Sequence, residues 1–134
     1  MVSRADSLTT RARPGCGPYL LEAYPSARRW QARTGLVFHA IRFARVSDAA
    51  YALGLRAIGD KSYMVRYRAC MVLAYSLRTE AIPALQALLQ HADARTREDA
   101  ARALDAIQHQ NHHYCYVTWR RAIFRKRDYR GRDT

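Results

Sequence analysis

From Tyr19 onward, apolar residues recur at the three- and four-residue spacings of amphipathic helices, separated by short polar segments. Gly and Pro are sparse here, and the good helix formers Ala, Leu and Arg dominate. Helix breakers and capping residues divide the stretch into six predicted helices, at residues 20–24, 26–45, 48–58, 63–77, 80–90 and 95–109. The predicted connections are short, so we expect successive helices to lie antiparallel.

Several residues mark where these helices begin and end. Ser47, Ser62, Thr79 and Asp93 stand where side chains cap a helix N-terminus. Pro83 falls in the first turn of its helix, where a missing N–H costs little. Before the helices, residues 14–18 read Pro-Gly-Cys-Gly-Pro, which predicts a break. We therefore expect a flexible leader at 1–18, a helical domain at 19–110, and a basic C-terminal arm or extra helix at 111–134.

An internal repeat relates the longer helices. Aligned on Arg33, Arg66 and Arg97, they are offset by 33 and then 31 residues. Small or apolar side chains fall one residue before each Arg and three, seven and ten residues after it, except for Thr96 and Ser76. These offsets trace one face of a helix. A period in this range, with two helices in each unit, is typical of an α-solenoid, so we predict an all-α superhelix of about three helix pairs.

Residues 60–107 resemble tandem HEAT repeats of the bacterial, bilin-lyase-like type. Asp60, Val65-Arg66, Ala69 and Leu73 fit the pattern of acidic turn, Val-Arg, small residue and Leu, and Arg97, Ala100 and Leu104 repeat it. Residues 19–58 are less similar, Thr96 replaces the expected Val, and His91 stands where an acidic turn residue would fall. The resemblance implies a scaffold with a concave binding surface. It also implies a structural role for the recurring Arg residues, with Asp60 and Asp93 as their natural acidic partners.

The helix predicted at 63–77 carries a second apolar stripe beside the repeat face. Its members are Met64, Tyr67, Met71 and Tyr75, with Arg68 next to them. A helix at the centre of a three-repeat stack would bury this stripe as core. On a concave face, the same residue types are those enriched at protein interfaces, which makes the five residues candidate partner-binding residues.

The chain is strongly basic, with a net charge of +12 over 134 residues, and nearly all of its cations are Arg. Biased coding composition would also produce an Arg-rich chain. The middle, residues 34–113, is close to balanced, whereas residues 114–134 carry seven basic groups against Asp128 and Asp133. Such basic ends favour acidic partners, among them acidic protein faces and nucleic acid. The candidate phosphate-contacting residues of the C-terminal arm are Arg120, Arg121, Arg125, Lys126, Arg127 and Arg130.

No catalytic or cofactor motif is evident, so we predict a protein that is not an enzyme, with no cofactor. His109, His112, His113 and Cys115 are the one cluster of metal-ligand types, but they are packed too closely in sequence for an ordinary structural zinc site, and we predict no metal. Three scattered Cys residues fit a reducing compartment. Without a signal peptide or membrane-spanning run, we expect a cytoplasmic protein that does not enter a membrane.

These observations favour a protein-interaction module, an adaptor or scaffold whose protein partner they do not identify. The alternative is a nucleic-acid-binding helical repeat, which would place Arg residues along the concave helices instead of mainly in the arms. A third reading is an auxiliary subunit of a larger assembly, because three repeats are near the minimum for a stable solenoid.

Overall fold

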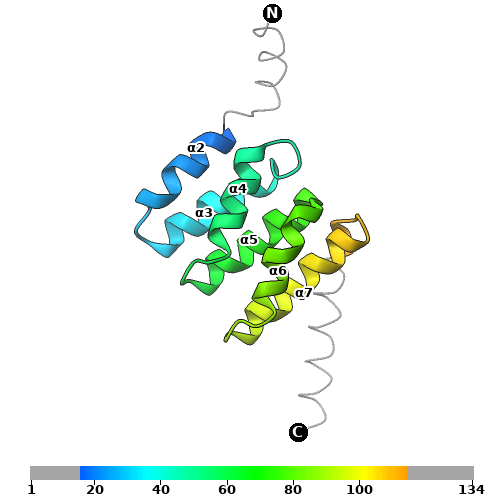
Figure 1. Cartoon of the computed structure of the whole chain (residues 1–134). Helices are drawn as coiled ribbons and strands as arrows, with labels where there is room; N and C mark the ends of the chain where they lie inside the picture. The colour runs from blue at the N-terminus through cyan, green and yellow to red at the C-terminus, as the bar shows by residue number, and fades with distance from the viewer. Residues whose placement is uncertain (1–15, 115–134) are drawn as a thin grey trace, which may run out of the picture.

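The computed structural model describes residues 16–114, and every regular element in that range is helical. The elements are α2 (Cys16–Ala23), the 3₁₀ turn η1 (Tyr24–Ser26), α3 (Trp30–Ile41), α4 (Asp48–Ala57), α5 (Tyr63–Ser76), the 3₁₀ turn η2 (Thr79–Ala81), α6 (Ile82–Leu88) and α7 (Ala94–Gln108). They form three helix pairs, α2–α3, α4–α5 and α6–α7, which follow one another in chain order (Figure 1). The predicted all-α solenoid of three helix-pair repeats is confirmed.

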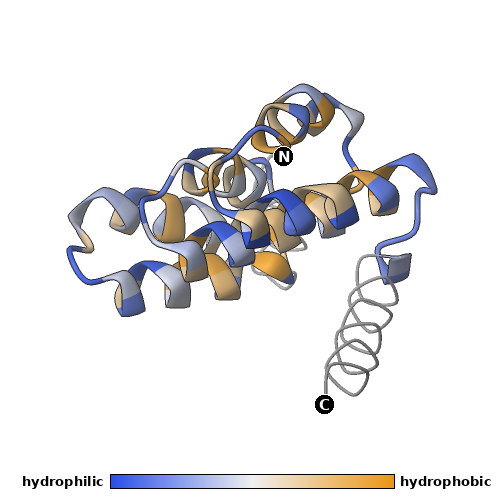
Figure 2. Cartoon of the chain, turned by 90° about the horizontal axis from the view of Figure 1, so that it is seen from below, coloured by the Kyte–Doolittle hydropathy of each residue, from blue (hydrophilic) through white to orange (hydrophobic). Residues whose placement is uncertain are grey.

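The second helices of the pairs form one layer, in which α5 packs against α3 on one side and α7 on the other. The first helices α4 and α6 pack on α5 and α7, and α2 covers α3 and α4. Hydrophobic and hydrophilic stretches alternate along the helices, as expected where each buries one face (Figure 2). The largest fully buried side chains include Leu53, Leu73, Leu85 and Ile107, each contributing about 1.5–3 kcal/mol by its burial.

The first helix begins earlier than the sequence predicted. Helix α2 starts at Cys16, so the expectation that residues 16–18 belong to a flexible leader is wrong. Pro18 lies in the first turn, where no intrahelical bond needs its N–H. Gly17 is buried and lets α2 approach α4 closely, because a Cβ at this position would collide with the Ser47 Oγ. The rest of the predicted leader, residues 1–15, lies outside the described residues. Of the predicted arm at 111–134, the structure describes only residues 111–114.

The predicted caps hold in part. The Ser47 hydroxyl accepts a hydrogen bond from the Ala50 N–H at 3.1 Å, and the Asp93 carboxylate accepts one from the Arg95 N–H at 2.9 Å. Ser62 occupies the N-cap position of α5, but its side chain makes no capping bond. The helix predicted at 26–45 is shorter, from Trp30 to Ile41, because the chain makes a 3₁₀ turn at η1 and then extends through Arg29.

The repeat face is buried throughout α5 and α7 but not in the first repeat. Ala32, one residue before Arg33, is exposed, and Leu36 is half-buried, whereas Val65 and Thr96 at the position of Ala32 are buried. Of the other second helices in the described stack, only α5 packs against α3, and it covers one side of it. Part of the α3 repeat face therefore has no described helix to pack against. The buried residues of α3 are Arg33, Val37 and Ala40. Of the repeat face, Ala40 and Phe43 are therefore buried, whereas Ala32 is not.

An Arg–Asp pair joins the first repeat to the second. Arg33 donates hydrogen bonds to both carboxylate oxygens of Asp60, at 2.7 Å from Nε and 3.1 Å from Nη2. Its Nη1 donates to the carbonyls of Ala27 and Arg28, which fixes the turn before α3. The Asp60 carboxylate also accepts hydrogen bonds from the Tyr24 hydroxyl and the Ser62 N–H, at 2.5 Å and 2.9 Å. The pair therefore ties two turns and two repeats together.

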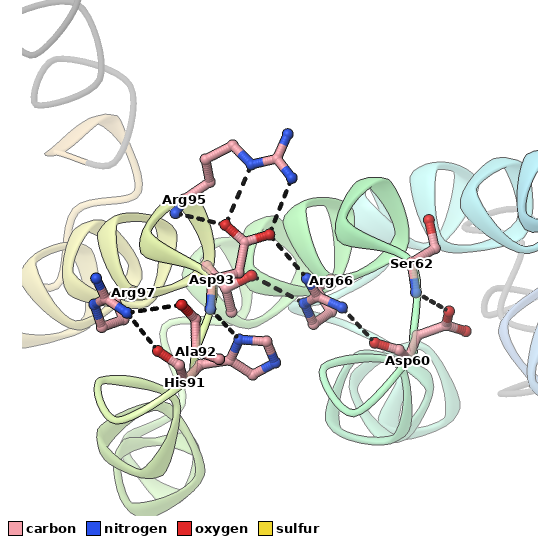
Figure 3. A network of polar contacts seen from close by, with 9 residues as sticks. Asp60, Ser62, Arg66, His91, Ala92, Asp93, Arg95 and Arg97 are labelled. Atoms are coloured by element: carbon pink, nitrogen blue, oxygen red, sulfur yellow. Dashed lines mark hydrogen bonds and ion pairs between the residues drawn. The ribbon is translucent and has the colours of Figure 1, made fainter.

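A second pair repeats this geometry one unit later (Figure 3). Arg66 donates from Nη2 to Asp93 at 3.2 Å and from Nη1 to the Asp60 carbonyl at 2.9 Å. Its Nε donates to the hydroxyl of Thr96 at 2.9 Å. Thr96 is fully buried, so the Thr that replaces the expected Val supplies a hydrogen-bond acceptor in the core. In both pairs the acidic partner lies 27 residues after the Arg.

The third Arg of the series keeps only the local part of this pattern. Arg97 donates from Nη1 to the carbonyls of His91 and Ala92, at 2.6 Å and 3.1 Å (Figure 3). It is exposed, and within residues 16–114 it forms no ion pair, since α7 ends the described stack. Each repeat Arg thus anchors the turn before its own helix, and the carboxylate pair forms where a following repeat supplies an Asp.

Candidate interaction surface

The five residues of the second apolar stripe, Met64, Tyr67, Arg68, Met71 and Tyr75, lie along α5, and we call them the α5 surface. All five are half-buried, whereas the repeat face of the same helix, including Val65 and Leu73, is completely buried. The difference arises because α3, α4 and α7 cover the other sides of α5. Of the two readings left open by the sequence, full burial in the core does not hold.

Arg68 lies between aromatic rings from two helices. Its guanidinium carbon is 4.6 Å from the ring centroid of Phe38 on α3 and 5.4 Å from that of Tyr67 on α5. Phe38 is 50 % exposed, which is unusual for so large an apolar side chain. Within the described part of the chain Arg68 forms no ion pair with an Asp or Glu. Cation–π contacts therefore orient this guanidinium while its charge stays uncompensated by a nearby carboxylate.

Beside Tyr67 the surface continues onto α7 through a mixed aromatic and charged group. Tyr63 and Tyr67 have ring centroids 6.2 Å apart, and the Arg95 guanidinium carbon lies 3.9 Å from the Tyr63 centroid. Arg95 also pairs with Asp93, and this hydrogen bond is the main reason that the pKa of Asp93 falls to about 2. Burial, together with the neighbouring Asp99 carboxylate, raises the pKa of Tyr63 to about 12.

Asp99 is a buried carboxylate at the edge of this group. It is 5 % exposed, accepts a hydrogen bond from Arg102 at 2.8 Å on Oδ1, and lies against the Tyr63 side chain. Burial raises the pKa of Asp99 to about 6, against the opposing effect of the Arg102 charge. Asp99 therefore changes its charge in a pH range where an ordinary Asp is fully ionised.

At the other end of the α5 surface, Tyr75 contacts the residues that follow α7. Its ring centroid is 4.5 Å from that of His112, and Arg45 donates to the Tyr75 carbonyl and lies 3.1 Å from the His112 Nδ1. His113 lies against His112, and His109 stacks on Tyr114. These His residues thus make ring contacts, and no group of three or more metal-ligating side chains meets within residues 16–114. Cys115, the fourth member of the sequence cluster, lies outside the described residues.

The structure places the other candidate residues in two groups. Arg33, Asp60, Arg66 and Asp93 form the inter-repeat pairs described above, and Arg97 anchors a turn. The nucleic-acid candidates of the C-terminal arm, from Arg120 to Arg130, lie outside the described residues. Cys16 and Cys70 form no disulfide within residues 16–114, and Cys70 is buried. None of the described helices is long and apolar enough to cross a membrane.

Sequence reasoning missed the residues that extend the α5 surface. Tyr63 lies on α5 itself, and other segments add Phe38, Arg45, Arg95 and His112. The period within one helix identifies its own stripe, but it contains no information on which neighbouring residues meet that stripe. The repeat alignment gave a partial indication that Phe38 and Arg68 are close, since they lie five and two residues after Arg33 and Arg66 on neighbouring second helices. The rotation between neighbouring helices decides whether such positions touch.

Comparison with known families agrees with the geometry. The family model of HEAT repeats matches residues 50–112, which span most of the second helix pair and all of the third. No curated protein and no solved structure matches the chain. The first pair, α2–α3, lies before the matched range, yet its Arg33 pairs with Asp60 as Arg66 pairs with Asp93. HEAT repeats are generally non-catalytic units that mediate protein interactions. The second and third helix pairs of the chain therefore carry HEAT repeats.

Proposed function

We propose that the chain is a non-enzymatic interaction module whose α5 surface binds an acidic segment of a partner protein. The observation that carries the proposal is Arg68, held between the rings of Phe38 and Tyr67 with no ion pair inside the described chain. An Arg fixed in this way can donate two parallel hydrogen bonds to an incoming carboxylate without first losing side-chain freedom. The partner we infer therefore carries an Asp or Glu.

The surroundings of Arg68 fit a partner segment that also carries apolar side chains. Met64 and Met71 are half-buried and flexible, and Met side chains adapt to irregular partner surfaces. Phe38 and Tyr67 supply aromatic area of the kind that dominates interface energetics. The combination favours a short amphipathic partner segment that places a carboxylate at Arg68 and apolar side chains over the Met residues. The net charge of +12 would raise the rate at which an acidic partner arrives.

Site-specific crosslinking tests this proposal. A photoreactive amino acid at Met71 should crosslink one partner in source lysate treated with nuclease, whereas the same group at Gln86, exposed on α6, should not. Binding of the purified partner should then weaken at least about tenfold in Arg68→Ala and Tyr67→Ala, as for interface hot spots. Arg68→Lys keeps the charge but not the planar fork, and we expect it to recover only part of the affinity.

Two results would reject the α5 surface as the binding site. One is equal crosslinking from Met71 and Gln86. The other is an affinity for the identified partner that does not change in Arg68→Ala. Loss of the crosslinked partner on nuclease treatment would instead favour the nucleic-acid alternative. The proposal places the module in a reducing cytoplasm, where cysteines such as Cys16 and Cys70 do not form disulfides.

A further inference from the structure

A basic hollow, which shares no residue with the α5 surface, lies where the start of α3 meets the turn before α5. It has a volume of about 560 Å³ and is lined by Arg28, Arg29, Trp30, Gln31, Arg33, Lys61 and Ser62. This volume falls within the range of about 300–1,000 Å³ that is usual for small-ligand sites. The lining contains four cationic side chains and no acidic one.

The cations of this lining differ in whether they form ion pairs. Arg33 is paired with Asp60, whereas Arg28, Arg29 and Lys61 are not fully buried and form no ion pair within residues 16–114. The helix ends beside them add to the positive potential. Helix α3 and helix α5 both begin without a side-chain cap and without an acidic residue in the first turn. An anion in the hollow would therefore meet guanidinium and ammonium groups together with uncapped backbone N–H groups.

Trp30 adds an aromatic surface to this positive hollow. It is 43 % exposed, and it directly follows the two unpaired Arg residues in the sequence. Proteins bind single-stranded nucleic acid by combining two features. Cationic side chains contact the phosphate backbone, and exposed aromatic rings stack on the bases. A duplex fits less well, because its bases are already stacked on one another and present no free face to Trp30.

We propose that this hollow binds a nucleotide unit of a single-stranded nucleic acid. The phosphates contact Arg28, Arg29 and Lys61, and the base stacks on Trp30. Gln31 lies within reach of a base edge or sugar as a polar group of the lining. The site is formed by residues 28–33 and the turn before α5, and none of its lining residues belongs to the α5 surface. Protein binding at Arg68 and nucleic-acid binding here can succeed or fail independently.

The test uses the full chain and a short fluorescein-labelled oligothymidylate. Fluorescence anisotropy gives the affinity at several salt concentrations, and the double variant Arg28→Ala/Arg29→Ala removes two of the proposed phosphate contacts. The matched control, Arg42→Ala/Arg56→Ala, removes the same charge from two exposed Arg residues outside the hollow. We expect the first double variant to bind at least about tenfold more weakly and to lower the slope of log affinity against log salt by about 1.4, at about 0.7 per phosphate. The control should retain nearly the full slope.

Trp30 supplies an independent readout of stacking. In a Trp119→Phe background Trp30 is the remaining Trp, and its fluorescence should be quenched as the oligonucleotide binds. Trp30→Ala should weaken binding, and Trp30→Phe should restore part of it, since any aromatic ring offers a stacking face. Far-UV circular dichroism confirms that each variant is folded before its affinity is compared.

Several outcomes would overturn the proposal. Equal loss in the two double variants would indicate non-specific attraction to net charge. Binding lost on deletion of residues 120–134 but unchanged in Arg28→Ala/Arg29→Ala would place the nucleic acid on the C-terminal segment. Thymidine monophosphate binding as tightly as the oligonucleotide would indicate a free-nucleotide site instead of a strand site. A phosphoserine peptide that binds the hollow where the oligonucleotide does not would assign it to a phosphorylated protein.

Discussion

Removing the carboxylate of Asp60 tests whether the inter-repeat Arg–Asp pairs hold the repeats together. The side chain of Asp60 is 5 % exposed and accepts two hydrogen bonds from Arg33, one from the Tyr24 hydroxyl and one from the Ser62 N–H. In Asp60→Ala these donors lose their acceptor, and the Arg33 guanidinium keeps its charge while 10 % exposed. The variant therefore leaves a nearly buried charge without its partner.

The expected cost follows from the hydrogen bonds and the ion pair that the substitution removes. Each buried donor left unpaired costs about 1–3 kcal/mol, and breaking one partner of a buried ion pair costs about 3–5 kcal/mol. Arg33 and Ser62 also line the basic hollow, so water can reach part of the vacated site and reduce the penalty. We therefore expect Asp60→Ala to lower the free energy of unfolding by about 3 kcal/mol, near the low end of the buried-pair range. Urea unfolding followed by circular dichroism measures this value.

Asp48 provides the matched control. It pairs with Arg78 at 2.7 Å, the same distance as the shorter Arg33–Asp60 contact, but its side chain is 93 % exposed. An exposed pair contributes about 0–1 kcal/mol, so Asp48→Ala should have a small effect. A second check is the double variant Arg33→Met/Asp60→Ala, which removes the stranded charge and should recover part of the lost stability. Equal costs for Asp60→Ala and Asp48→Ala would refute the structural role of the pair.

The Asp60 effect should also depend on pH. Burial alone would raise the pKa of Asp60, but the hydrogen bonds from Arg33 and Tyr24 outweigh burial and hold the pKa below its usual value. The stabilisation is therefore fully present above the ordinary Asp pKa of about 4 and is lost as the pH falls through the lowered pKa of the folded state. The stability difference between the wild type and Asp60→Ala should be constant near neutral pH and shrink below about pH 4. A difference independent of pH would show that the carboxylate charge is not responsible.

Three further predictions concern the α5 surface, Asp99 and the His residues. Met71→Ala should cost less than about 1 kcal/mol in urea unfolding, whereas Leu73→Ala, at a fully buried site on the same helix, should cost about 2–5 kcal/mol; similar costs would make Met71 a core residue. Because the folded-state pKa of Asp99 is raised to about 6, its ionisation should lower stability by about 3 kcal/mol between about pH 4 and pH 6, and Asp99→Asn should abolish this slope. Purified protein should hold no stoichiometric zinc by elemental analysis, and His112→Ala/His113→Ala should melt close to the wild type; a large drop in melting temperature on adding a chelator would contradict this.

The sequence by itself determined the fold class and the repeat. Helical spacing, caps and the recurring Arg residues are local or periodic features, so the three helix pairs and the burial of Val65, Leu73 and Thr96 could be read without coordinates. The sequence also showed a second apolar stripe on the helix that became α5, but it left open whether that stripe is buried as core or forms a binding surface. Helix ends were less predictable. The residue that follows α5, Leu77, has a left-handed backbone with φ of 57°, a conformation for which sequence rules expect Gly. Helix α2 begins inside a segment rich in Gly and Pro.

Tertiary structure alone decided which side chains from different helices meet. The placement of Arg68 between Phe38 and Tyr67 depends on how α3 and α5 are rotated against each other, and no pattern within either helix sets that angle. The basic hollow likewise joins the start of α3 to residues some thirty positions later in the chain, because the second helices lie side by side. Asp99 is a further example, because the packing of α7 against α5 gives it a buried environment and a raised pKa that its place in the sequence does not indicate. Periodicity fixes which face of a helix is buried, whereas the geometry of packing fixes what that face touches.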